Sequence, residues 1–312
     1  MAALLPRDQA LILFSTISAL FYILFIITLI KFRKKPQIGD PFFTICISVG
    51  IVDVLMLIHL HLFYKYPYWG AFLADHVKTN PNGLVANYSV ISRWFLVCAQ
   101  YFGVTALSFN RFTRIMYPER HKKLWNSTCL SLVITLQWLL PLFGISPLFF
   151  NDVIVYVDQL GGAHIALGHK IDTKTFFLFH LSCSLVLMLV IGAACTAMVW
   201  RVWGLGTVQR NAVIGSGELV LAFDGGVIFL AMCLYNVLLL LAIVNHSDEF
   251  LLRSDNFFIW SVVSDAFSWM NVYLLFFTAK SVRIHMFNLL LCTEKWPNIS
   301  IKWSVHPITP NK

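Results

Sequence analysis

Residues 42–63 read FFTICISVGIVDVLMLIHLHLF, a stretch in which Asp53 is the single acidic residue and which contains no lysine or arginine. An α-helix needs about 20 mostly apolar residues to cross the hydrocarbon core of a bilayer. No water is present there to pair with backbone groups, so the segment must pair them within itself as a helix. The stretch therefore predicts a transmembrane helix with a carboxyl group near its middle.

Six further stretches have the same length and apolar character. The chain of 312 residues is 58% hydrophobic and 12% charged, whereas an average soluble domain is about 25% charged. A soluble fold is excluded, and little chain is left for a second domain. We predict an all-α integral membrane protein, a seven-transmembrane helix bundle that forms one domain over residues 1–312. Its tail, residues 280–312, should begin as a helix over Ser281–Leu291. The six stretches are Ala10–Ile30, Ser92–Ile115, Thr128–Phe150, Phe176–Trp200, Leu219–Val244 and Asn256–Ala279.

Basic residues gather at alternate helix ends. They follow the first, third, fifth and seventh stretches, as in Lys31–Lys35 and Arg111–Lys123, and are sparser on the other side. Cytoplasmic loops carry the excess of lysine and arginine in membrane proteins. We therefore expect the N-terminus outside and the C-terminus in the cytoplasm. The formal net charge of +8 is then explained by basic residues at the membrane's inner face, and it does not indicate a nucleic-acid partner.

The connecting segments carry three further expectations. Residues Tyr64–Ile91 are interpreted as a long outside loop, and the alternating Val153, Val155 and Val157 suggest a short strand or hairpin in the next one. Asn87 and Asn245 begin Asn-x-Ser sequons on the expected outer side and are predicted to be glycosylated, whereas the sequons at Asn126 and Asn298 should face the cytoplasm.

The cysteines lie almost all within predicted helices, where they act as small apolar residues. No expected outside loop contains a cysteine, so no outer disulfide framework is available. Cys292 differs because it lies in a juxtamembrane segment, Phe287–Cys292, and it is a candidate for palmitoylation.

Three carboxyl groups fall inside predicted helices: Asp53, Asp224 and Asp265. Intramembrane carboxylates are rare and costly, so each is a functional-site hypothesis. For Asp53 the alternative is a protonated side chain bonded to a neighbouring backbone group. If the three are cation or proton sites, the protein is a transporter or an ion channel. The chain shows no internal repeat of the kind found in many transporters.

Arg111, at the end of the third predicted helix, has two interpretations. It either snorkels to the inner interface or is held by a carboxylate in one state and released in another. The preceding residue is Asn110 and not an acid, so Glu218 or Asp224 in the sixth helix would be the partner.

Polar and aromatic residues cluster in the outer halves of several helices. Each alone is explained by packing or by a hydrogen bond between helices. Together they predict a mixed pocket between bundled helices, and an arginine near its mouth favours a neutral or weakly anionic organic ligand of low mass. The predicted pocket residues are Tyr101, His180, Tyr235, Trp260, Arg93, Gln100 and Asp265.

The sequence gives little support for an enzymatic function. Asp224 and Asp265 could pair as in an intramembrane aspartyl protease, but the Gly-x-Gly-Asp signature is absent. The nucleophile elbow and the His-Glu-x-x-His zinc motif are missing too. His59 and His61 are two residues apart and point to different helix faces, which makes a poor metal pair. We expect a non-enzymatic protein without a cofactor or a metal.

A family resemblance rests on three groups of motifs. The run Asn110-Arg111-Phe112-Thr113-Arg114-Ile115, followed by Pro118, His121 and Trp125, resembles the third-helix and second-loop signature of nematode serpentine chemoreceptors. Gln137-Trp138 with Pro141 is similar to the same group, as are Tyr273-Leu274-Leu275 with Ser281-Val282-Arg283, and Asp53. The pattern resembles the class gamma superfamily, with class V as its nearest subclass, and extends over the whole chain.

The resemblance implies a G-protein-coupled-receptor-like protein of the plasma membrane, in the cilia of sensory neurons, that binds a small molecule and a heterotrimeric G protein. Three features depart from rhodopsin-like receptors: Asn110 replaces an aspartate, Asn271-Val272-Tyr273 lacks the proline of Asn-Pro-x-x-Tyr, and no cysteine in the second outside loop can bridge to the third helix. They put a standard activation mechanism in doubt. The residues expected to couple to the G protein are Arg111, Asn110, Arg114, Lys122 and Lys123.

Overall fold

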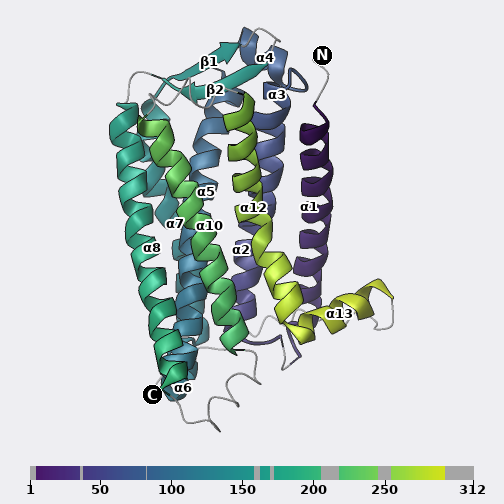
Figure 1. Ribbon diagram of the computed structural model, residues 1–312, viewed down its shortest axis with the longest axis vertical. Coiled ribbons are helices and arrows are strands. Elements are labelled where there is room, and N and C mark those ends of the chain that lie inside the picture. Colours follow the sequence, from purple (N-terminus) through teal and green to yellow (C-terminus); the bar gives the residue numbers. More distant parts are fainter. Residues whose placement is uncertain are drawn as a thin grey trace, which may run out of the picture.

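A computed structural model shows an elongated bundle of long helices that run side by side (Figure 1). The structure describes residues 5–35, 38–81, 83–157, 162–168, 172–204, 218–244 and 254–291. Asn245, Asn298 and Cys292 lie outside these ranges. Glu218 and Asp224 lie within a described helix, but their side chains are outside the described part.

A helix occupies each of the seven predicted stretches. Five of them are long and apolar enough to cross a membrane, and α12 with α13 would add a sixth span whose two parts are bent by 97°. The seven helices are α1 (Pro6–Phe32), α2 (Pro41–Leu60), α5 (Leu84–Met116), α7 (Ser127–Ile145), α8 (Thr173–Trp203), α10 (Glu218–Val244) and α12 (Ser254–Thr278). The shorter helices are η1 (His61–Lys65), α3 (Tyr66–Tyr68), α4 (Ala74–Thr79), α6 (Pro118–Leu124), η2 (Ser146–Phe150) and α13 (Lys280–Leu290).

Local chemistry sets several of these boundaries. At the start of α2, Pro41 needs no hydrogen-bond partner for its nitrogen, and the Asp40 side chain accepts a hydrogen bond from the Phe42 amide at 2.9 Å. Asn126 caps α7 in the same way by accepting from the amide of Cys129 at 2.8 Å. This sequon asparagine therefore has a structural role at the helix start.

Two sequence-based boundaries are wrong. Helix α5 begins at Leu84 and not at Ser92, so the expected outside loop over residues 64–91 is much shorter. Helix α2 also continues into that region, as the π-helical turn η1 and then α3. Both helices therefore reach further toward one end of the bundle than their apolar stretches indicated.

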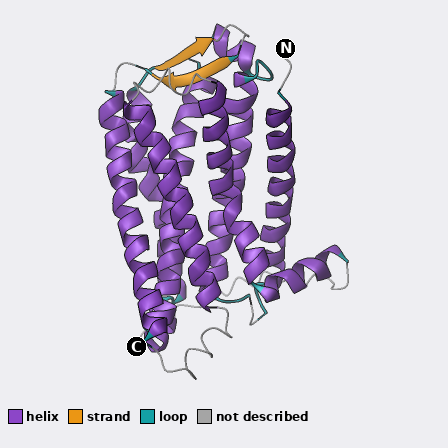
Figure 2. Cartoon of the chain, in the orientation of Figure 1, coloured by secondary structure: helices purple, strands orange, loops and turns teal. Residues whose placement is uncertain are grey.

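The predicted hairpin is confirmed at that same end. Strands β1 (Val153–Val157) and β2 (Ala163–Leu167) pair antiparallel, with Val155 opposite Ile165. Figure 2 shows the two strands lying across the end of the bundle at which α1 begins. We call this the sheet end and the opposite end, where α13 projects sideways, the α13 end. The hairpin packs on α5 through a buried cluster that includes Val90, Trp94 and Ile165.

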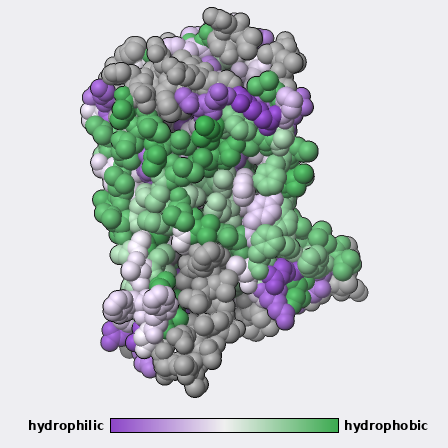
Figure 3. Space-filling view, in the orientation of Figure 1, coloured by the Kyte–Doolittle hydropathy of each residue, from purple (hydrophilic) through white to green (hydrophobic). Residues whose placement is uncertain are grey.

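Helix α5 is central, since it contacts α2, α7, α8 and α10. Two buried clusters divide the interior: one toward the sheet end around Tyr101 and Trp260, the other toward the α13 end around Tyr22 and Leu107. The outside is apolar as well. Figure 3 shows a hydrophobic band around the middle of the visible face, with hydrophilic residues toward its two ends. This is the surface of a multi-pass membrane protein.

Candidate functional site

The side chain of Arg93 on α5 lies among aromatic rings in the sheet-end half of the bundle. Its guanidinium carbon is 4.5 Å from the ring centre of Trp260, 4.9 Å from that of Tyr64 and 5.8 Å from that of Trp94. Aromatic faces attract cations in this geometry. No carboxylate among the described residues forms an ion pair with Arg93. The site therefore holds a positive charge that aromatic rings stabilise and that no acid of the described chain neutralises.

Tyr101 and Tyr235 join Trp260 in the same buried cluster. The two tyrosine rings meet edge to face with centres 6.3 Å apart. Asn236 on α10 donates a hydrogen bond to the Tyr101 hydroxyl at 3.3 Å and accepts one from Ser184 on α8. The structure thus brings four predicted pocket residues, Arg93, Tyr101, Tyr235 and Trp260, together from α5, α10 and α12.

His180 lies at the side of this cluster. Its ring centre is 4.7 Å from that of Trp94 and 4.4 Å from that of Phe176. The Trp94 ring therefore lies close to both His180 and the Arg93 guanidinium. Tyr64 was not predicted to be a pocket residue, although it directly follows the second apolar stretch.

Gln100 belongs to a separate network centred on Asp53. The Asp53 carboxylate accepts hydrogen bonds from Tyr22 at 2.5 Å, from Gln100 at 2.7 Å and from Asn271 at 3.3 Å. The Gln100 amide also donates to Ser268 at 3.1 Å. These buried residues come from α1, α2, α5 and α12, so one carboxyl group links four helices. The bonds are to side chains and not to the neighbouring backbone that the alternative interpretation invoked.

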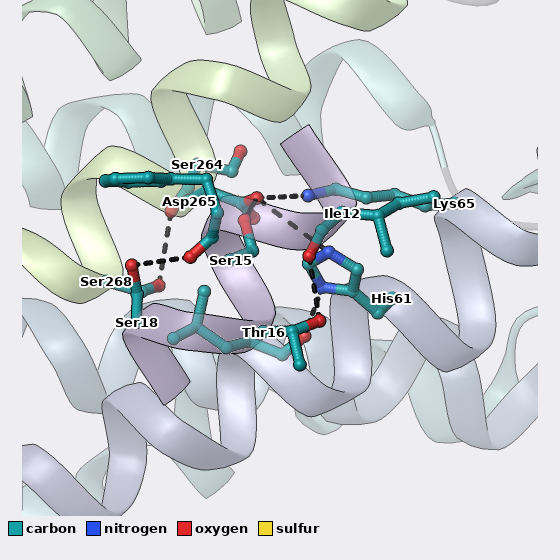
Figure 4. Close-up of polar contacts among 11 residues, drawn as sticks. Ile12, Ser15, Thr16, Ser18, His61, Lys65, Ser264, Asp265 and Ser268 are labelled. Atoms are coloured by element: carbon teal, nitrogen blue, oxygen red, sulfur yellow. Dashed lines mark hydrogen bonds and ion pairs between the residues drawn. The ribbon is translucent and has the colours of Figure 1, made fainter. Parts of the chain in front are cut away.

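Asp265 on α12 forms a second buried polar centre. Its carboxylate lies 2.5 Å from the Lys65 ammonium group, and neither side chain is exposed. The Ser15 hydroxyl donates to the same oxygen, and the ring of His61 lies 4.0 Å from it. In Figure 4 the side chains of Lys65, His61 and Ser15 converge on Asp265. The structure thus places Asp265 in an ion pair apart from the Arg93 cluster, with a lysine that sequence analysis had assigned to a loop.

Arg111 lies inside the α13 end of the bundle and is 3% exposed. Its guanidinium is 4.8 Å from the ring centre of Phe42. It also faces α10, since a Cβ atom added to Gly225 would lie 3.5 Å from one of its nitrogens. The adjacent Asn110 is fully buried, whereas Lys122 and Lys123 are exposed. Of the expected coupling residues, the two lysines lie on the surface, and Asn110 and Arg111 lie beneath it.

The motif residues around Arg111 hold α6 against α5. The indole of Trp125 donates to the Thr113 hydroxyl at 2.8 Å, and the Thr113 oxygen lies 3.1 Å from the ring nitrogen of His121. Burial lowers the pKa of His121, with Arg114 adding to the effect and Asp40 opposing it. Arg114 itself pairs with Asp40 at 2.6 Å. These contacts give the residues of the motif a structural role at this spacing.

A second motif joins α2, α5 and α7. Ser48 donates to the Gln137 carbonyl at 2.9 Å and accepts from the Trp138 indole at 3.1 Å. A Cβ atom on Gly103 would lie 2.6 Å from both Gln137 and Val49. Only glycine permits this close approach.

Comparisons with known proteins agree with one another. The family model described as "Serpentine type 7TM GPCR chemoreceptor Srv" matches residues 11–292. The chain is similar to serpentine receptor class V-1 of Caenorhabditis elegans, with 30% identity over 78% of this chain and 77% of the relative. It is also similar to serpentine receptor class gamma-8 of that organism, with 28% identity over 53% and 52% of the two chains. Melatonin receptor type 1C of Xenopus laevis is 24% identical over 44% of this chain and 31% of its own length.

Proposed function

The chain belongs to the Srv family of serpentine seven-transmembrane chemoreceptors, and from this premise we propose that it binds a small molecule outside the cell and signals through a heterotrimeric G protein. The family consists of receptors and not enzymes, which confirms the expectation of a non-enzymatic protein, and the predicted resemblance to nematode serpentine receptors is confirmed as well. We further propose that the sheet end faces the outside and the α13 end the cytoplasm, in the plasma membrane of a sensory cell, at its cilium.

The Arg93 cluster carries the ligand part of this proposal. A guanidinium surrounded by rings of Tyr64, Trp94 and Trp260, without an acidic partner among the described residues, has capacity left for a ligand oxygen. The surrounding rings offer rigid apolar contact. This combination supports a small organic ligand that has an apolar body and a carbonyl, hydroxyl or carboxylate oxygen. A cationic ligand is disfavoured because Arg93 would repel it.

Contacts in the interior of the bundle support a route by which ligand binding at the sheet end affects the α13 end. Tyr101 and Trp260 lie in the sheet-end cluster, and Gln100, next to Tyr101 on α5, donates to Asp53. Asp53 in turn joins four helices. A ligand shifts the population of two helix arrangements only if it binds one of them more tightly. We propose that ligand contacts on α10 and α12 provide this difference, with Arg111 beside α10 at the other end. Glu218 or Asp224 remains its proposed switch partner.

The test is heterologous expression with a G-protein readout against a panel of neutral and weakly anionic small molecules. We expect agonist-dependent nucleotide exchange, no agonist-dependent net current, and loss of the exchange in Arg111→Ala at matched surface expression. Lys122→Ala with Lys123→Ala should weaken coupling while leaving agonist affinity nearly unchanged. Agonist-dependent current or proton-coupled flux without nucleotide exchange would instead indicate the transporter or channel alternative.

A further inference from the structure

A cavity of about 370 Å³ lies on the outer side of the bundle toward the sheet end, between α2, α5 and α7. Its size is within the roughly 300–1,000 Å³ range of small-molecule pockets. Aliphatic and aromatic side chains form most of its wall, among them Ile91 and Leu96 on α5 and Trp138 and Leu142 on α7. The Arg93 cluster lies elsewhere, because none of its rings lines this cavity.

The cavity opens toward lipid. Leu55 and Ile58 on α2 and Leu142 on α7 are 43%, 44% and 43% exposed, and they stand at its wall on the apolar outside of the bundle. A ligand therefore enters from the hydrocarbon and must itself partition into the membrane.

The polar part of the wall is small and uncharged. It consists of His59, Ser92 and the ring of Tyr88, and no lysine, arginine, aspartate or glutamate lines the cavity. His59 is 4% exposed and forms no ion pair with an acid of the described chain. No charged side chain in the cavity wall would compensate the charge of a fatty acid or of a phospholipid headgroup.

A backbone carbonyl competes with His59 Nδ1 for the proton of the Ser92 hydroxyl. The Nε2 atom of His59 lies 3.0 Å from the carbonyl oxygen of Ser89, which only accepts, so Nε2 carries a proton and, in the neutral ring, Nδ1 is an acceptor. The Ser92 hydroxyl contacts both His59 Nδ1, at 3.2 Å, and the carbonyl of Tyr88. One hydroxyl proton cannot fully serve two acceptors. A hydroxyl group supplied by a ligand would satisfy the second.

We propose that this cavity binds a membrane lipid of the sterol class, with its hydroxyl group at His59 and Ser92 and its ring system along α2, α5 and α7. A sterol carries one neutral hydroxyl on an apolar body, which matches the single uncharged polar corner. Its fused rings are rigid, so it loses less conformational freedom on binding than a linear alcohol of similar size.

The site is connected to the Arg93 cluster through one carbonyl group. The Ser89 carbonyl accepts from His59 and also from the Tyr64 hydroxyl at 3.2 Å, and the Tyr64 ring lies against Arg93. A sterol that restrains the His59 side chain therefore also restrains Tyr64, which lies against Arg93.

The experiment uses the full-length receptor in phospholipid nanodiscs with a diazirine-bearing photoreactive sterol as the probe. We expect saturable labelling on α2, α5 or α7 that unlabelled cholesterol prevents. Leu142→Trp should fill the cavity and lower labelling at least fivefold. Leu139→Trp is the matched control, because Leu139 is also on α7, is 49% exposed and does not line the cavity; it should label as the wild type does.

Competition tests the hydroxyl assignment. The 3-keto analogue of cholesterol accepts hydrogen bonds but cannot donate one, so it should compete about fivefold less well. Ser92→Ala removes one of the two contacts of the hydroxyl and should reduce this preference. Labelling that rises linearly with probe, or that falls equally in Leu142→Trp and Leu139→Trp, would overturn the site. Equal competition by the ketone, or better competition by a linear alcohol, would overturn the sterol assignment.

Discussion

Replacing Lys65 by methionine should destabilise the receptor more than any single surface substitution. Lys65 and Asp265 are both 0% exposed and their charged atoms are 2.5 Å apart. Removing the ammonium group leaves a buried carboxylate with Ser15 and a distant His61 as its polar neighbours. Breaking a buried pair by removing one partner costs about 3–5 kcal/mol, and methionine fills most of the space of the lysine stem.

The assay is thermal unfolding of purified receptor in one detergent at one pH. A loss of about 3–5 kcal/mol should lower the midpoint temperature by on the order of 10 °C. The control is Lys78→Met, which breaks the exposed pair between Lys78 and Asp75, where the aspartate is 97% exposed. Exposed pairs contribute about 0–1 kcal/mol, so this variant should unfold close to the wild type.

The double variant Lys65→Met with Asp265→Leu tests whether the loss of stability comes from the unpaired carboxylate. Removing both charges leaves no uncompensated group, so the double variant should be more stable than Lys65→Met alone. If Lys65→Met unfolds like Lys78→Met, or if the second substitution makes the receptor less stable still, the reasoning about a desolvated ion pair is wrong.

Three other predictions follow from single residues. Gly103→Ala should destabilise the protein by about 1–3 kcal/mol in the same unfolding assay, because its methyl group would lie 2.6 Å from atoms of two neighbouring side chains, whereas Gly226→Ala, with nothing within 4 Å, should be neutral. Because the pKa of His121 is lowered in the folded state, the unfolded chain takes up the proton first as the pH falls through about 6.5, so stability should decrease there. His121→Phe should remove that part of the pH dependence, and an unchanged slope would count against it. Asn87→Gln should remove a glycan detected by glycosidase-sensitive gel mobility while Asn126→Gln changes nothing; a glycan on Asn126 would reverse the proposed orientation.

The positions of the helices could be predicted because hydrocarbon imposes one length and one backbone solution on each span. Their ends could not. Helix α5 starts at Leu84, eight residues before the apolar stretch, and its first turns contain polar residues that lower the hydropathy. There the Asn87 amide donates to the Gly83 carbonyl and the Ser89 hydroxyl to that of Ala86, so the polar side chains bond within the helix itself.

The site was predictable in part for a related reason. Polar and aromatic residues are easily recognised as pocket candidates when the surrounding sequence is apolar. Four of the candidates, Arg93, Tyr101, Tyr235 and Trp260, do lie together in the structure. Which polar residue meets which could not be read from the sequence. Lys65 and Asp265 are separated by 200 positions, and Lys65 lies just beyond an apolar stretch, so only the packing of α12 against η1 shows that it is buried.

Agonist potency at Arg93→Gln, compared with Arg7→Gln at equal surface expression, tests the central claim most directly. Both arginines lie toward the sheet end and against aromatic rings, but Arg7 pairs with Asp255 at 2.8 Å whereas Arg93 has no such partner in the described chain. A ligand oxygen held by Arg93 contributes about 1.5–3 kcal/mol, so Arg93→Gln should shift the dose response at least tenfold to higher concentration and Arg7→Gln should not. Wild-type potency in Arg93→Gln, or an equal shift in both variants, would contradict the account.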